Sequence, residues 1–361
     1  MTRPAIYFAI TAHGFGHAVR AASVAARVQQ LDPEILLILV TTAPRWLLDS
    51  YISGDFIQRL RAFDVGVIQS DSINMDKGAT LERLQQIRAQ QNSIIASEAD
   101  YLRTNRVKLV LADIPFLAAP IANAAGVPCW MMGNFGWDFI YRDWGGEFNE
   151  IADWIGDCYG KCDRLFRLPL YEPMTAFPQI TDVGLTGGTP HFSEETLRET
   201  FKWTASANQT ILLTFGGLGL QQIPYNNIED FPDWEFITFD REAPELANLI
   251  VVRDRQYRPV DFMPFCGRIV SKPGYSTFSE ALRLGVPVVS LTREGFAESP
   301  LLIEGIQDYA FHQILSPEEF FQSRWEFLHR PLQPPHQPTS LPGDGTDTIA
   351  RTLINACRAD P

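Results

Sequence analysis

Short, almost wholly apolar runs recur along the chain, and most are followed by a turn and a longer segment with helical spacing. Clear examples are residues 5–10, 35–41 and 107–112 in the first half, and 210–215 and 286–291 in the second. Continuous apolar runs of this length suit strands that are buried on both faces of a parallel sheet. The alternation with helices predicts a doubly wound α/β architecture.

The remaining elements follow from weaker signals of the same kind. Further strands are predicted at residues 127–132, 236–239, 249–252 and 268–270. Helical spacing predicts helices at residues 18–31, 80–104, 120–126, 193–202, 277–284 and 346–357. Ser316-Pro317-Glu318-Glu319 has the pattern of a capping box with proline at the first helical position, which predicts a helix from there to about His329.

A stretch rich in proline and poor in periodicity, residues 167–190, separates two similar α/β halves, and we interpret it as an interdomain linker. At about 100–200 residues per domain, 361 residues suggest two domains. We place the first at residues 1–180 and the second at 181–345, with a C-terminal helix in 346–361 that can pack back on the first. Ligands of such sheets bind at the carboxyl ends of the strands, so a cleft between two facing halves is expected.

Composition narrows the classes of partner. The formal net charge is −13, which disfavours nucleic acid as a partner. Five scattered cysteines do not form a disulfide framework, and no metal site has ligands at the right spacing. The apolar runs are far shorter than the roughly 18 residues of a membrane span, and no leader pattern precedes them. We therefore expect a cytoplasmic protein without a transmembrane segment, which leaves room for peripheral membrane contact only.

Two glycine-rich turns follow predicted strands: Gly14-Phe15-Gly16 and Gly217-Leu218-Gly219. Neither has the third glycine of the dinucleotide fingerprint, and the chain has no P-loop motif, so a nicotinamide-dependent dehydrogenase and a P-loop kinase are both disfavoured. Such turns can bring backbone N–H groups to an anion at a helix N-terminus. A tight turn without a ligand is an equally good interpretation.

His17 and Asp113 are the candidate catalytic pair. His17 begins a predicted helix directly after the first strand, and Asp113 ends another strand at the same edge of the sheet. A neutral imidazole there can accept a proton, and a carboxylate can hold it in the right tautomer. The alternatives are a histidine that only packs and an aspartate that caps a turn. His13 and His17 have no third partner that would make a metal site.

Glu280 has two interpretations. Thr277-Phe278-Ser279-Glu280 matches a capping box, in which the glutamate bonds the backbone at Thr277. A carboxylate at a helix start beside a nucleotide can instead accept hydrogen bonds from ribose hydroxyls. The sequence alone leaves both open.

The segment Ser271 to Leu282, followed by Gly285-Val286-Pro287, resembles the nucleotide-binding half of GT-B glycosyltransferases. Its spacing is similar to that of the transferase that adds N-acetylglucosamine to the peptidoglycan lipid precursor. The resemblance implies the GT-B fold, with two Rossmann-like domains that face each other across a cleft. It also implies that Glu280 holds the ribose and that Glu298, the second of the pair Ala297-Glu298, contacts the donor sugar.

The whole chain is still more similar to the glycosyltransferase-like N-terminal region of plant L-arabinokinases, over about residues 5 to 310. The galactokinase-type kinase domain of those enzymes is not part of the resemblance, so sugar kinase activity is not expected. The shared motifs are Gly14-Phe15-Gly16-His17-Ala18, Asn134-Phe135, Trp137-Asp138-Phe139-Ile140-Tyr141, Arg167-Leu168-Pro169, Pro173-Met174, Ala176-Phe177, Phe215-Gly216-Gly217, Gly274-Tyr275 and Ser279-Glu280-Ala281-Leu282.

Together these features predict an enzyme that moves a hexosyl or pentosyl group from a nucleotide-sugar, in the first instance a UDP-sugar, to an acceptor hydroxyl with inversion. His17 is the expected base and Asp113 its partner. The nucleotide-sugar is a substrate, and neither a cofactor nor a metal is expected. The expected donor-binding residues are Gly216, Gly217, Leu218, Lys272, Gly274, Tyr275, Ser276, Thr277, Glu280 and Glu298. The expected acceptor-side residues are Gly14, Phe15, Gly16, Asn134, Trp137 and Asp138. Phe139 and Tyr141 can line this side together with Trp137, although an aromatic cluster of this kind is more often part of a core.

Two alternatives have the same fold. One is a nucleotide-sugar epimerase that acts without an acceptor, and the other is a non-catalytic module that binds a nucleotide-sugar. The sequence predicts neither the acceptor, nor the sugar, nor the oligomeric state.

Overall fold

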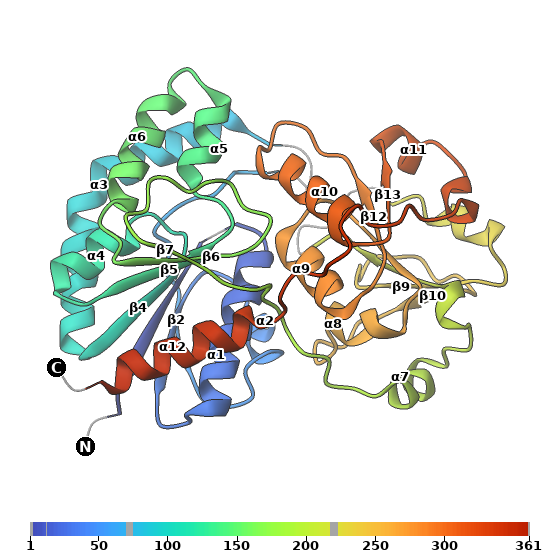
Figure 1. The fold of residues 1–361 in the computed structure, drawn as a ribbon, viewed down its shortest axis with the longest axis horizontal. Helices are drawn as coiled ribbons and strands as arrows, with labels where there is room; N and C mark the ends of the chain where they lie inside the picture. The colour runs from blue at the N-terminus through green and yellow to red at the C-terminus, as the bar shows by residue number, and fades with distance from the viewer. Residues whose placement is uncertain (1–2, 12, 70–74, 217–222, 360–361) are drawn as a thin grey trace. The chain divides into compact units, whose positions relative to one another are not determined.

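The computed structural model describes residues 3–11, 13–69, 75–216 and 223–359. The chain divides into two compact units. The first runs to Gly187 and takes up the chain again from Pro342, and the second spans Gly188–Leu341. Each unit is built on one sheet in which all strands are parallel (Figure 1).

The first unit has a seven-stranded sheet in the order β3-β2-β1-β4-β5-β6-β7. The central strands are nearly continuous apolar runs and are buried on both faces, as parallel sheets require. The strands are β1 (Ala5–Ile10), β2 (Leu36–Val40), β3 (Ile57–Arg59), β4 (Val107–Asp113), β5 (Cys129–Gly133), β6 (Arg164–Arg167) and β7 (Ile180–Asp182).

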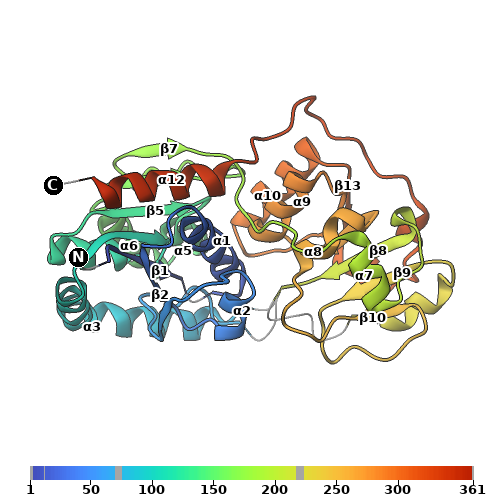
Figure 2. The same cartoon turned by 90° about the horizontal axis from the view of Figure 1, so that it is seen from below.

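Helices cover both faces of this sheet. One face carries α1 (Gly16–Leu31), α2 (Arg45–Asp49) and α12 (Gly345–Arg358), and Figures 1 and 2 both show α12 beside α1. The other face carries α3, α4, α5 and α6, in which α3 packs chiefly on α4 and α5 on α6. Their bounds are α3 (Lys77–Thr104), α4 (Ala118–Ala125), α5 (Trp137–Trp144) and α6 (Phe148–Tyr159).

The second unit has a six-stranded sheet in the order β10-β9-β8-β11-β12-β13. Its strands are β8 (Thr210–Thr214), β9 (Glu235–Thr238), β10 (Leu249–Val251), β11 (Arg268–Ser271), β12 (Val288–Leu291) and β13 (His312–Leu315). Its helices are α7 (Glu194–Phe201), α8 (Pro259–Phe262), α9 (Tyr275–Leu284), α10 (Glu298–Tyr309) and α11 (Pro317–Phe321). A large apolar cluster on one face of this sheet includes the fully buried Trp325.

Two sequence predictions need correction. The predicted linker contains β7, which pairs with β6 in the first sheet, so the chain leaves the first unit at Gly187 and not at residue 180. The chain re-enters that unit at Pro342 rather than after residue 345.

The helix predicted from Pro317 to about His329 is also wrong in extent. It ends at Phe321, because Trp325 takes a left-handed backbone (φ 62°) and turns its indole into the core, where Nε1 donates to the Phe320 carbonyl. A short 3₁₀ helix, Glu326–His329, follows it. Packing of the Trp325 side chain in the core therefore determines the backbone here, against the helix that the local sequence predicts.

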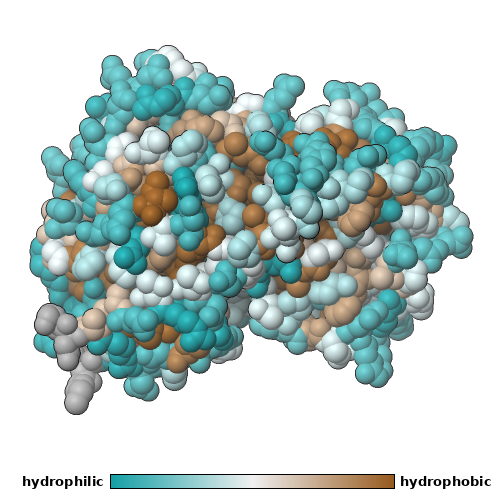
Figure 3. All heavy atoms as spheres, viewed as in Figure 1, coloured by the Kyte–Doolittle hydropathy of each residue, from teal (hydrophilic) through white to brown (hydrophobic). Residues whose placement is uncertain are grey.

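The surface in Figure 3 is mostly hydrophilic, with small apolar patches scattered over it. None of the helices in the described part of the chain is long and apolar enough to cross a membrane.

Candidate active site

The first unit brings His17 and Asp113 into direct contact. β1 and β4 are neighbours, with Ile10 in register with Asp113, and α1 starts a few residues after β1. The imidazole Nδ1 of His17 lies 2.7 Å from Oδ1 of Asp113, although 96 residues separate the two in sequence. His17 is 8% exposed and Asp113 1%. This arrangement can hold the ring with Nδ1–H donating to the carboxylate, which leaves Nε2 to accept a proton.

Arg20 completes this pair and was not predicted from the sequence. Its Nε donates to Oδ2 of Asp113 at 2.7 Å and its Nη2 donates to Oδ1 at 2.5 Å, and all of its side chain is buried. Burial alone raises the pKa of Asp113, but the guanidinium of Arg20 and the ring of His17 outweigh burial, so the pKa is lowered. Asp113 is therefore an ionised acceptor at neutral pH, and Arg20 supplies the compensating charge.

Arg20 also ties the pair to the loop after β5. Its Nη1 donates to Oδ1 of Asn134 at 3.1 Å, so Asn134 helps to hold Arg20 beside Asp113. The rings of Phe135 and Trp137 lie 5.9 and 6.2 Å from the His17 ring. The Nε1 of Trp137 donates to Thr11 and Asp64.

Burial assigns several predicted acceptor-side residues to the core. Trp137 and Tyr141 have no exposed surface and stack on each other in the core, so they do not line an open surface. Phe139 is half-buried. Asp138 is largely buried near Gly136, its Oδ1 has no hydrogen-bond partner among the described residues, and burial raises its pKa.

The glycine turn before α1 remains accessible. Gly14 has a left-handed backbone (φ 60°) and is exposed, as is Gly16, the first residue of α1. Phe15 is half-buried and packs edge-on against Trp46, with ring centroids 5.7 Å apart. The two glycines are thus exposed directly before the buried His17 in the chain.

In the second unit, several predicted donor-binding residues gather at the carboxyl ends of neighbouring strands. Gly216 follows β8, and a Cβ built on it would lie 3.7 Å from Cε of Lys272, which follows β11. Gly274 is the N-cap of α9, and Tyr275, Ser276 and Thr277 form its first turn. Backbone N–H groups at such a helix start can bind an anion. Gly217 and Leu218 lie outside the described residues.

Glu280 does not form the capping box considered from the sequence. α9 starts at Tyr275, so Thr277 lies inside the helix and not at its N-cap. The Oε1 of Glu280 instead accepts the backbone N–H of Gly188 at 2.9 Å, while Nη1 of Arg283 donates to the Gly188 carbonyl at 3.0 Å. Glu280 is buried, and burial raises its pKa to about 7. This glutamate is thus joined to the first residue of the second unit.

Glu298 is the first residue of α10, the helix that follows β12, and is 7% exposed. β11 and β12 are neighbours in the sheet, so Glu298 lies on the same edge as the start of α9.

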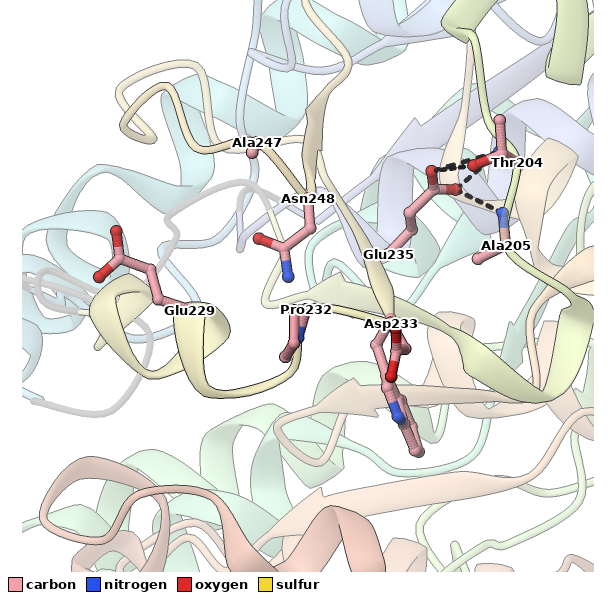
Figure 4. Close-up of a pocket in the computed structure, with 9 residues that line it drawn as sticks. Thr204, Ala205, Glu229, Pro232, Asp233, Glu235, Ala247 and Asn248 are labelled. Carbon is pink, nitrogen blue, oxygen red and sulfur yellow. Dashed lines mark hydrogen bonds between the residues drawn. The ribbon is translucent and has the colours of Figure 1, made fainter.

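Two further features of the structure are not part of this site. A hollow of about 460 Å³ lies at the amino ends of β9 and β10, the opposite edge of the second sheet (Figure 4). Its carboxylate Glu235 already accepts hydrogen bonds from the backbone of Thr204 and Ala205. No group of three His, Cys, Asp or Glu side chains that could hold a metal was found in the part of the chain that the structure describes.

The chain is similar in sequence to a known plant enzyme. No protein-family model matches the chain. The L-arabinokinase of Arabidopsis thaliana is 28% identical over 326 residues, which are 88% of this chain and 31% of that protein. The chain therefore spans about a third of the length of this relative.

Solved structures give a match over the whole chain. The calicheamicin glycosyltransferase CalG4 has a TM-score of 0.62, with 15% identity and complete coverage of both chains. The chain has the fold of the GT-B glycosyltransferases. Arabidopsis thaliana UGT89C1, another GT-B protein, matches 99% of this chain and 91% of its own at 13% identity. Its TM-score is 0.59 for the complex with quercetin and 0.54 for the complex with UDP.

Sequence reasoning missed Arg20 and Asp64, which contact the His17 pair and Trp137. The one signal for Arg20 is its spacing of three from His17, which places both on one face of α1. Asp64 comes from a distant segment and gave no local signal.

Proposed function

We propose that this GT-B protein is a glycosyltransferase that moves a sugar from a UDP-sugar to an acceptor hydroxyl with inversion. The observation that carries the proposal is the buried Asp113 carboxylate 2.7 Å from Nδ1 of His17, at the carboxyl ends of two adjacent strands. The L-arabinokinase similarity and the GT-B fold support the same reaction class.

The reaction is a single displacement. Nε2 of His17 takes the proton of the acceptor hydroxyl while that oxygen forms a bond to the anomeric carbon. The bond from that carbon to the diphosphate oxygen breaks, and UDP leaves with the electron pair. Attack opposite the leaving group inverts the anomeric configuration. Asp113 stays ionised and stabilises the imidazolium that forms, because Arg20 compensates its charge in the resting state.

The second unit supplies the donor side of the proposal. The first turn of α9 and the neighbouring Lys272 offer N–H groups and a positive charge to the diphosphate, where negative charge develops as UDP leaves. Glu280 can accept hydrogen bonds from ribose hydroxyls, and Glu298 can contact the sugar. In this scheme no bound metal is required, so activity should survive a chelator.

The test is release of UDP from a panel of UDP-sugars, first with water and then with candidate alcohols as acceptors. His17→Ala should lower the rate about 10²–10⁴-fold, since it removes the base. The control is His336→Ala, because His336 is an exposed histidine of the second unit. A rate for His17→Ala equal to that of the control would refute the role of His17. A changed sugar configuration without UDP release would instead indicate an epimerase, and tight binding without turnover a binding module.

A further inference from the structure

The residue directly after Asp113 has a strained backbone. Ile114 has φ 53°, a left-handed conformation that is unusual for a β-branched residue, and it is fully buried. Strain of this kind persists only where the surroundings hold the residue in place, and it tends to occur at functional sites. Contacts of the surrounding residues must therefore hold Ile114 in this conformation.

The hydroxyl of Tyr159, the last residue of α6, holds it. Tyr159 donates to the carbonyl of Ile114 at 2.8 Å and accepts the backbone N–H of Trp137 at 3.2 Å. Its side chain has no exposed surface, and its ring stacks on Phe177 with centroids 4.5 Å apart. One buried hydroxyl thus joins the end of β4 to the start of α5.

Both peptide groups that bond the Tyr159 hydroxyl are connected to the residues around His17. The Ile114 peptide follows Asp113, which bonds His17 and Arg20. The Trp137 peptide ends the loop that begins at Asn134, and Asn134 accepts from Arg20.

Glu172 holds the same loop through further hydrogen bonds. Its Oε1 accepts the N–H of Gly136 at 3.2 Å, its Oε2 accepts the N–H of Met174 at 2.6 Å, and its own N–H donates to the Asn134 carbonyl at 2.9 Å. The sequence motifs Asn134-Phe135, Pro173-Met174 and Ala176-Phe177 therefore meet around the Asn134–Trp137 loop and Tyr159. Their side chains are mainly buried and do not form an open ligand-binding surface.

We propose that Tyr159 and Glu172 are positioning residues that fix the Asp113–His17 pair for proton transfer, through Ile114 on one side and the Asn134–Trp137 loop on the other. The catalytic part of this inference rests on the proposed glycosyltransferase function. A small displacement of a catalytic group can cost about 100-fold in rate, so loss of either positioning residue is expected to lower kcat.

The test compares Tyr159→Phe with Tyr7→Phe. Tyr7 is also buried in the first unit, but its hydroxyl donates to Glu98, away from His17. Tyr159→Phe should lower kcat for UDP release about 10–100-fold with KM unchanged, whereas Tyr7→Phe should leave both constants unchanged.

The second readout is the ¹⁵N spectrum of histidine-labelled protein without substrate, with the His17 signal assigned from His17→Gln. The wild type should show Nδ1 protonated and hydrogen-bonded, Tyr159→Phe should shift or broaden that signal, and Tyr7→Phe should not. This spectrum tests the positioning role of Tyr159 even if the protein turns over no UDP-sugar. Failure of the positioning proposal can therefore be distinguished from failure of the proposed function.

Circular dichroism shows whether each variant folds. If Tyr159→Phe does not fold, Glu172→Gln is the test variant. The single amide oxygen of glutamine can accept only one of the two backbone N–H groups that the two carboxylate oxygens of Glu172 accept. Glu172→Gln should lower kcat and shift the His17 signal, both to a smaller degree. Wild-type kcat together with a wild-type His17 signal in the folded variant would overturn the proposal.

Discussion

The buried carboxyl of Glu280 makes the stability of the second unit depend on pH. Burial raises its pKa from the ordinary value of 4.5 to about 7, against the opposing effects of the Gly188 N–H and of Arg258 and Arg283. The folded state therefore binds this proton more tightly than the unfolded state does. Stability from this group is complete below about pH 4.5 and is lost as the pH rises through about 7.

The size of the effect follows from the shift. A difference of about 2.5 pKa units at 1.36 kcal/mol per unit gives about 3 kcal/mol between pH 4 and pH 8 or above. Glu280→Gln keeps an acceptor for Gly188 and cannot ionise. The difference in unfolding free energy between the variant and the wild type should therefore shift by about 3 kcal/mol in favour of the variant as the pH rises over this range.

Thermal unfolding of wild type and variant from pH 4.5 to 8.5 measures this gain. In a unit of this size, 3 kcal/mol corresponds to about 6–12 °C in the transition of the second unit. Glu199→Gln is the control, because Glu199 is exposed on α7 and its loss should leave the pH dependence unchanged. A constant difference between Glu280→Gln and wild type at all pH values would refute the reasoning.

Two other substitutions, each with a matched control, test the first unit. Asp113→Asn leaves Arg20 buried without its countercharge and should cost about 3–5 kcal/mol in urea unfolding and about 10²–10⁴-fold in UDP release. Asp182→Asn breaks an ion pair whose carboxylate is exposed, and should cost less than about 1 kcal/mol; equal costs would contradict the assignment. Gly345→Ala places a Cβ 2.0 Å from the Gly184 carbonyl oxygen and should destabilise the unit by about 1–3 kcal/mol, measured by thermal unfolding. Gly78→Ala, with no atom nearer than 3.6 Å, should be neutral or slightly stabilising, and a matching loss there would show that the close approach is not the cause.

Much of the fold could be predicted from the sequence, because buried parallel strands are continuous apolar runs. The runs in β1, β4 and β8 illustrate this. β3 and β7 carry no such signal, since each has three residues and lies at an edge of the sheet with polar or charged side chains. β7 was consequently included in the predicted linker.

The candidate site was predictable where it depends on strand ends. His17 and Asp113 could be paired because His17 follows β1 and Asp113 ends β4, at the same edge of one parallel sheet. The bond from Glu280 to Gly188 joins residues 92 positions apart and has no local pattern. The left-handed backbone of Ile114 could not be predicted from the sequence either, because isoleucine rarely adopts this conformation.

The NMR time course of a UDP-sugar turned over by the wild-type protein tests the proposed inverting transfer most closely. UDP should appear together with a sugar product whose anomeric configuration is opposite to that of the donor. His17→Ala should slow its appearance about 10²–10⁴-fold, whereas His336→Ala should not. Retention of the donor configuration in the first product formed, or turnover that does not depend on His17, would rule out this mechanism.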